Sequence, residues 1–66
     1  MEAFKVRLIN EQFELQEKIN TLNGFINSES FGNIDIFQQN LLKEQIVAME
    51  SYNNILIKRL AALGIN

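Results

Sequence analysis

The side chains most able to do chemistry in this sequence are carboxylates, serines, lysines and one tyrosine, because histidine and cysteine are absent. Histidine is the commonest general base and cysteine a strong nucleophile, so the usual catalytic pairs cannot form. A short acidic cluster holds Glu11, Glu14 and Glu17. Glu14 stands four residues before Lys18, a spacing typical of an ion pair on an exposed helix face. We therefore expect a protein that is not an enzyme.

Metal and phosphate motifs are also missing. A di-metal carboxylate bundle needs Glu followed three residues later by His, and structural zinc sites use Cys or His. We expect neither a metal nor a cofactor. Ser28 and Ser30 fall in a segment rich in Asn, Ser and Gly, where serine is better explained as a turn or capping group than as a nucleophile. No glycine-rich phosphate loop is present.

Groups that could bind a ligand are more plentiful. Nine Asn and five Gln supply amides that suit a polar ligand, or that only solvate the outer faces of helices. Lys58 and Arg59 are the densest basic pair, although cations near a helix end also complement the helix dipole. Tyr52 stands seven residues before Arg59 on the same helical face. It could stack on a base while Arg59 contacts phosphate, or it could be a core residue with a solvated hydroxyl.

Two long helices must position these groups. Proline is absent, and glycine occurs only at positions 24, 32 and 64, so two long stretches contain no strong helix breaker. In each stretch, apolar residues recur at spacings of three, four or seven, the period of one helical face. These residues are Phe4, Leu8, Leu15, Ile19, Leu22 and Ile26 in the first stretch, and Leu42, Ile46, Met49, Leu56, Leu60 and Leu63 in the second.

The sequence therefore predicts an all-α fold, an antiparallel hairpin of two long helices that assembles into an oligomeric helix bundle. We expect helix one over about residues 2–27, a turn over about 28–33 and helix two over about 34–63, in a single domain covering 1–66. A connection this short folds the second helix back along the first.

Capping signals support these limits. Asp35 followed by Gln38 matches a capping box, with Asn33 a competing N-cap. At the other end, Gly64 can adopt the left-handed conformation and place Ile65 against the preceding turn, as in a Schellman cap.

The turn region raises two further expectations. Gly24 lies inside the first helix, where it costs about 1 kcal/mol relative to alanine. It either allows a neighbouring helix to pack closely or marks fraying toward the turn. Phe25, Ile26 and Phe31 bracket the turn and are expected to pack against Phe37, which would fix the angle of chain reversal.

A second apolar stripe runs beside the first on each helix. It comprises Val6, Ile9 and Phe13, then Ile34, Phe37, Leu41, Ala48, Tyr52 and Ile55. A lone antiparallel pair needs only one stripe per helix, whereas helices in a larger bundle present a wider apolar arc. A 66-residue chain is marginally stable alone, and without cysteine or histidine it has neither disulfides nor zinc as a staple. The second stripe therefore predicts the interface of a homo-oligomer, a dimer or higher.

The charge balance limits the partners. Six Lys and Arg against eight Asp and Glu give a formal charge of −2, so DNA binding is disfavoured. The longest apolar runs, such as 46–49, are far shorter than the roughly 20 residues that span a bilayer. Glu2, Lys5 and Arg7 interrupt the apolar residues near the start, where a signal peptide would need an apolar core. We expect no membrane partner and a cytoplasmic protein.

About 50 of the 66 residues carry a pattern that resembles short proteins of tailed and crAss-like bacteriophages, above all between Leu41 and Arg59. Its residues are Phe13, Glu14, Leu15, Lys18, Ile19, Leu22, Phe25, Ile26, Ser28, Phe31, Gln38, Leu41, Leu42, Gln45, Ala48, Met49, Tyr52, Ile55, Leu56 and Arg59. The resemblance implies a phage accessory protein in the cytoplasm of an infected bacterium.

In architecture, the expected hairpin is similar to phage sponge proteins that sequester immune nucleotide signals and inhibit CBASS and Thoeris defence. This similarity implies an anti-defence protein whose oligomer binds a cyclic or phosphorylated nucleotide at subunit interfaces. Arg59, Lys58 or Lys43 would contact phosphate, and Tyr52 would contact the base.

Two other functions are compatible with the sequence. The first is a protein-binding inhibitor or adaptor, such as an anti-CRISPR protein or a transcription-factor inhibitor, that binds a host or phage protein, for example a host defence protein, through the spare apolar stripe. The second is an RNA-binding hairpin dimer, which ranks last because the basic residues are scattered.

The second stripe gives a direct prediction about mass in solution. At micromolar concentration we expect sedimentation analysis to show a dimer or larger, because monomers would leave that stripe in water. A well-folded monomer under these conditions would contradict the prediction.

Overall fold

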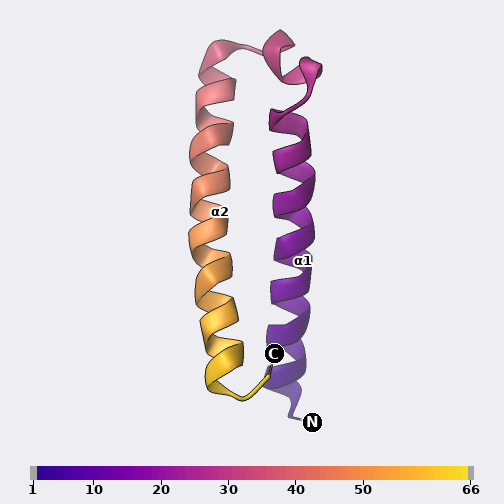
Figure 1. Ribbon diagram of the computed structural model, residues 1–66, viewed down its shortest axis with the longest axis vertical. Coiled ribbons are helices and arrows are strands. Elements are labelled where there is room, and N and C mark those ends of the chain that lie inside the picture. Colours follow the sequence, from indigo (N-terminus) through magenta and orange to yellow (C-terminus); the bar gives the residue numbers. More distant parts are fainter. Residues whose placement is uncertain (1, 66) are drawn as a thin grey trace.

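The computed structural model describes residues 2–65 as two antiparallel helices joined at one end (Figure 1). α1 spans Ala3–Ile26, the short 3₁₀ helix η1 spans Glu29–Asn33, and α2 spans Ile36–Ala62. Both termini lie at the end opposite η1. The molecule measures 46 × 16 × 15 Å, and its radius of gyration of 14.7 Å exceeds the roughly 11 Å of a compact chain this long. The all-α hairpin is confirmed for these residues.

The core lies along the single line where α1 and α2 meet. Leu8, Leu15, Ile19, Leu56 and Leu60 are buried there. Ile9, Ile46, Met49 and Ile65 are half-buried against them. Phe4 and Leu63 were expected on this line but are 45% and 37% exposed, because both stand at the open end of the hairpin where no further helical turn covers them.

A buried amide network crosses this line. Asn53 is only 5% exposed, and its side-chain oxygen accepts a hydrogen bond from Gln12 Nε2 at 3.2 Å. Asn53 Nδ2 donates to Gln16 Oε1 at 2.9 Å, and Gln16 Nε2 donates to Asn20 Oδ1 at 3.0 Å. The bonds from Asn53 to Gln12 and Gln16 join the two helices and fix which residues stand opposite each other. The Gln16–Asn20 bond lies within α1 and is exposed.

The start of α2 corrects the expected cap. Asp35 is the N-cap, and its carboxylate accepts a hydrogen bond from the Phe37 N–H at 3.2 Å. The side chain that turns back is Gln39, not Gln38, and its Nε2 donates to the Ile34 carbonyl at 2.9 Å. Because Ile34 has extended backbone and Asp35 is the non-helical N-cap, α2 begins two residues later than expected. The competing cap, Asn33, is instead the last residue of η1.

The end of α2 confirms the Schellman cap. Gly64 has a φ of +75°, in the left-handed region that favours glycine. The Ile65 N–H donates to the Leu60 carbonyl at 2.8 Å, and the Gly64 N–H donates to the Ala61 carbonyl at 3.0 Å. Ile65 then packs half-buried against the core.

The turn is held by an aromatic pair. The Phe25 and Phe31 rings meet edge to face with centroids 5.9 Å apart, and Phe31 is buried. Ser28 serves as a capping group, because its hydroxyl donates to the Phe25 carbonyl at 2.6 Å. Phe37 does not join this cluster and is 65% exposed. It stands five residues before the inward-facing Leu42, about 140° away around the helix.

We expect Asn53→Ala to lower the free energy of unfolding by about 1 to 3 kcal/mol, because it removes buried hydrogen bonds and leaves Gln12 and Gln16 without their partner. Urea unfolding followed by circular dichroism measures this. The matched control is Asn54→Ala, at the exposed neighbouring position, which should change stability by less than about 0.5 kcal/mol. Equal effects of the two substitutions would contradict the structural role of Asn53.

Gly24 lies within α1, and a Cβ added there would meet nothing within 4 Å. We expect Gly24→Ala to raise the free energy of unfolding by about 0.4 to 1 kcal/mol, since alanine favours the helix. Thermal unfolding measures the change, with the left-handed Gly64→Ala as a destabilised comparison. A loss of stability from Gly24→Ala would show that another subunit packs against this backbone.

Candidate functional site

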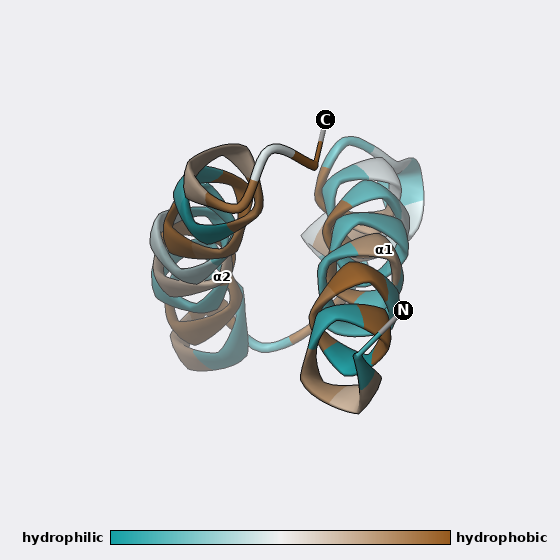
Figure 2. Ribbon diagram, turned by 90° about the horizontal axis from the view of Figure 1, so that it is seen from below, coloured by the Kyte–Doolittle hydropathy of each residue, from teal (hydrophilic) through white to brown (hydrophobic). Residues whose placement is uncertain are grey.

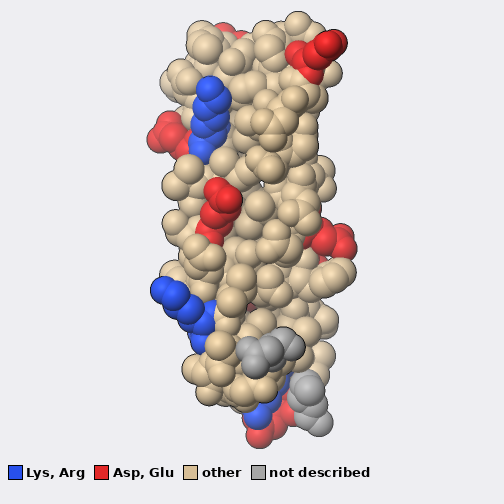
Figure 3. Space-filling model, viewed as in Figure 1, with Lys and Arg blue, Asp and Glu red and all other residues tan. Residues whose placement is uncertain are grey.

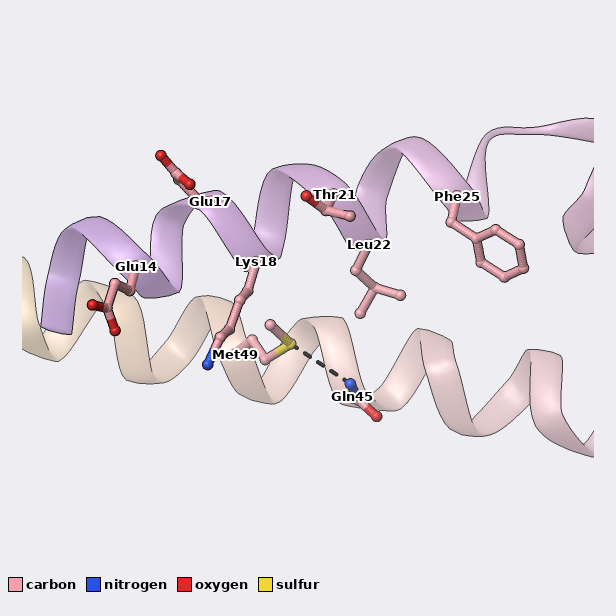
Figure 4. Close-up of a pocket in the computed structure, with 8 residues that line it drawn as sticks. All are labelled: Glu14, Glu17, Lys18, Thr21, Leu22, Phe25, Gln45 and Met49. Atoms are coloured by element: carbon pink, nitrogen blue, oxygen red, sulfur yellow. Dashed lines mark hydrogen bonds between the residues drawn. The ribbon is translucent and has the colours of Figure 1, made fainter.

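A groove opens between the two helices in the half of the hairpin nearest the turn (Figure 4). It has a volume of about 600 Å³. Its lining residues are Glu14, Glu17, Lys18, Thr21, Leu22, Phe25, Gln45 and Met49. Leu22, Phe25 and Met49 give it an apolar surface, while Thr21 and Gln45 supply hydrogen-bonding groups. This combination of an apolar surface with a few polar groups is typical of small-molecule sites.

The groove carries little positive charge. Lys18 extends across the gap toward Met49 of α2 (Figure 4). The expected ion pair between Glu14 and Lys18 is wrong, because the ion pair formed among residues 2–65 joins Lys5 Nζ to Glu2 at 3.8 Å. Lys18 can therefore meet an anion. With two glutamates and one lysine, however, the groove of one chain has a formal charge of −1.

The structure places the sequence-predicted ligand residues along α2. Lys43 stands near the turn, with its Nζ 5.8 Å from the centre of the Phe31 ring, a cation–π contact. The Tyr52 hydroxyl donates to the Glu11 carboxylate across the two helices. Lys58 and Arg59 are exposed near the other end of α2.

One chain does not bring these four residues together. Lys43 and Arg59 are 16 positions apart, which corresponds to about 24 Å along a helix. On the face seen in Figure 3, the charged side chains are likewise scattered rather than gathered into a basic patch. Sequence reasoning missed Lys18 and Phe25 as ligand candidates, although their seven-residue spacing places them on one edge of α1.

Exposed apolar side chains are the other prominent feature. Among the described residues, 11 large apolar side chains are exposed, whereas six apolar residues are buried. Apolar segments of the ribbon are not confined to the side where the helices meet (Figure 2). Of the predicted interface, Ile9 and Ile34 are half-buried and the rest are exposed. The exposed members are Val6, Phe13, Phe37, Leu41, Ala48, Tyr52 and Ile55.

The predicted second stripe divides into two separate surfaces, one on each helix. Leu41, Ala48, Tyr52 and Ile55, which we name the α2 face, are exposed on α2. The α2 face lies on the same side of the hairpin as the groove, because Tyr52 bonds to Glu11 there. Phe13 stands two residues after Glu11, about 200° around α1, so Phe13 faces away from the α2 face.

A third set of exposed apolar residues was not predicted. Ile36, Val47 and Ile57 of α2 are 66%, 61% and 45% exposed. Their helical positions place them on the opposite side of α2 from Leu41 and Tyr52. Neither helix of residues 2–65 has an apolar stretch of the length needed to cross a membrane.

The fold and the groove together define a small two-helix protein with an open groove between its helices and a large exposed apolar surface. The family model for Sequestin matches residues 2–62, which is nearly the whole chain. The chain therefore belongs to the Sequestin family.

A relative from Enterobacteria phage T4 supports the expected phage connection. The chain is 38% identical over 61 residues to this uncharacterized 7.5 kDa protein of the denB–rIIB intergenic region. The match covers 92% of the chain and 95% of the relative. These comparisons support a short phage accessory protein. No solved structure matches the chain.

Proposed function

We propose that this chain is a phage anti-defence protein that sequesters a nucleotide immune signal at the subunit interfaces of a homo-oligomer. The observation that carries the proposal is the groove beside Lys18 and Phe25, in a chain of the Sequestin family. The family's name suggests sequestration, which requires stoichiometric binding without turnover. Such a protein needs no catalytic group and would act in the cytoplasm of the infected bacterium.

The groove suits one nucleoside unit. Its volume of about 600 Å³ is within the range of small-molecule sites. The Phe25 ring offers an aromatic surface for a base, and Thr21 and Gln45 can exchange hydrogen bonds with its edge. Lys18 can donate charge-assisted hydrogen bonds to a phosphate oxygen. A purely apolar ligand would leave these polar groups unused.

The exposed apolar surface favours one alternative function. A chain that exposes more large apolar side chains than it buries could act as an anti-CRISPR-like inhibitor or adaptor of a host defence protein. In that case the α2 face would cover a complementary apolar surface on the host protein. Purification from infected cells of a stable complex with one defence protein, combined with no nucleotide binding, would favour this alternative.

Calorimetric titration tests the sponge function. We expect the purified oligomer to bind at least one member of a panel of cyclic di- and trinucleotides and cyclic ADP-ribose isomers. Lys18→Gln should weaken that binding about tenfold or more, because a hydrogen bond to a charged group contributes about 1.5 to 3 kcal/mol.

The matched control is Lys5→Gln, which removes the same charge outside the groove and should leave the affinity unchanged. Failure of every compound in the panel to bind would overturn the proposed function.

A further inference from the structure

The α2 face and the open side of the groove lie on one side of the hairpin, and both are uncovered. We propose that a second copy of this chain docks on the α2 face with its own α2 antiparallel to the first. Ala48 would then lie opposite the partner subunit's Tyr52. The docked copy would close both grooves and bring the partner subunit's Arg59 to the edge of each. The role given to Arg59 rests on the proposed function.

The spacing of the α2 face matches helix pairing. Together with Gln45 and Arg59, which are exposed on the same side of α2, the residues of the α2 face recur at alternating steps of four and three residues, the repeat of a coiled-coil seam. The positions are Leu41, Gln45, Ala48, Tyr52, Ile55 and Arg59. A coiled-coil seam needs two helices whose apolar residues have the same spacing. A second copy of this chain presents the same spacing, so it can pair with the α2 face.

The sizes of the side chains favour an antiparallel pair. With the two-fold axis near position 50, the small Ala48 lies opposite the large Tyr52 of the partner, and this contact occurs twice. Leu41 then lies opposite the aliphatic stem of the partner's Arg59. A parallel pair would instead place Ala48 against Ala48, which leaves a gap, and Arg59 beside Arg59, which adds like-charge repulsion.

The single chain exposes more surface than a compact monomer of its mass. The chain exposes 4880 Å², whereas a compact monomer of 7.6 kDa exposes about 4,300 Å². The excess reflects the elongated two-helix shape. Stacking two hairpins through the α2 face would bury Tyr52 and Ile55, which are 44% and 55% exposed in the single chain. Burial of these side chains supplies the apolar contact that a chain with so small a core lacks.

The pairing completes the groove. In one chain, Arg59 is 10 positions from Met49, the nearer groove residue of α2, which is about 15 Å along the helix, and Arg59 does not line the groove. In the antiparallel pair, the partner subunit's Arg59 lies opposite Leu41, one turn from Gln45. Each groove then gains a cation at the end that holds Phe25, and its formal charge rises from −1 to 0. A site for a phosphorylated ligand is therefore incomplete without the second copy.

Cysteine cross-linking tests the arrangement without any ligand, because the chain has no native cysteine. We expect a mixture of Gln45→Cys and Ile55→Cys chains to form a covalent dimer of one chain of each kind under mild oxidation. A mixture of Leu41→Cys and Arg59→Cys chains should behave in the same way. Each variant alone should form no covalent dimer, because identical positions lie too far apart in this register for a disulfide.

Phe13→Cys is the control, since Phe13 is exposed on α1 and faces away from the α2 face; mixed with Ile55→Cys, it should give no covalent dimer. Cross-linking of Gln45→Cys to itself would show a parallel pair and overturn the proposal. Absence of cross-links in both mixtures would also overturn it. Because these outcomes need no nucleotide, they are distinguishable from failure of the sponge function.

Discussion

The hydrogen bonds that Asn53 makes with Gln12 and Gln16 set the alignment on which the rest of the structure depends. Leucine and isoleucine pack almost equally well at several offsets along two helices, whereas a buried amide is satisfied at only one. This alignment places Met49 and Gln45 opposite the part of α1 that holds Lys18 and Phe25. A shift of one turn would preserve an apolar core and destroy the groove. The polar residue of the core therefore determines where the groove forms.

A hairpin of two helices has one line of contact, and this geometry explains its exposed apolar residues. Each helix can bury only the side that faces the other, so a helix with apolar residues on several sides leaves most of them in water. The imbalance is greatest on α2, where Leu41 and Tyr52 are exposed on one side and Ile57 on the opposite side. The chain thus has as many apolar residues as a pair of helices from a larger bundle, but two helices alone can bury only some of them. Association with another copy or with a host protein would bury the remaining apolar side chains.

Local patterns allowed the helices and their ends to be predicted. The repeat of Leu8, Leu15 and Ile19 and the glycine at position 64 depend on neighbours within a few residues, so they can be identified without a partner helix. The same holds for Asp35 as the N-cap of α2.

Features that depend on two segments meeting could not be predicted in the same way. Asparagine is usually a surface residue, so its type did not indicate that Asn53 is buried. The groove combines edges of both helices, and only their alignment shows that Phe25 and Gln45 share it. Phe37 was assigned to the turn cluster by proximity in sequence, but the helical angle set by Asp35 directs it into solvent.

The two ends of the hairpin differ in how firmly the helices are held together. At the turn, the chain itself joins α1 to α2, and the Phe25–Phe31 ring pair packs across the junction. At the other end, the helices are joined by side chains such as Ile65, while Phe4 remains exposed. Local opening should therefore begin at the termini and rarely extend to the groove, which lies nearer the turn. The groove would be preformed before a ligand binds, so little of the binding free energy would be lost in ordering its side chains.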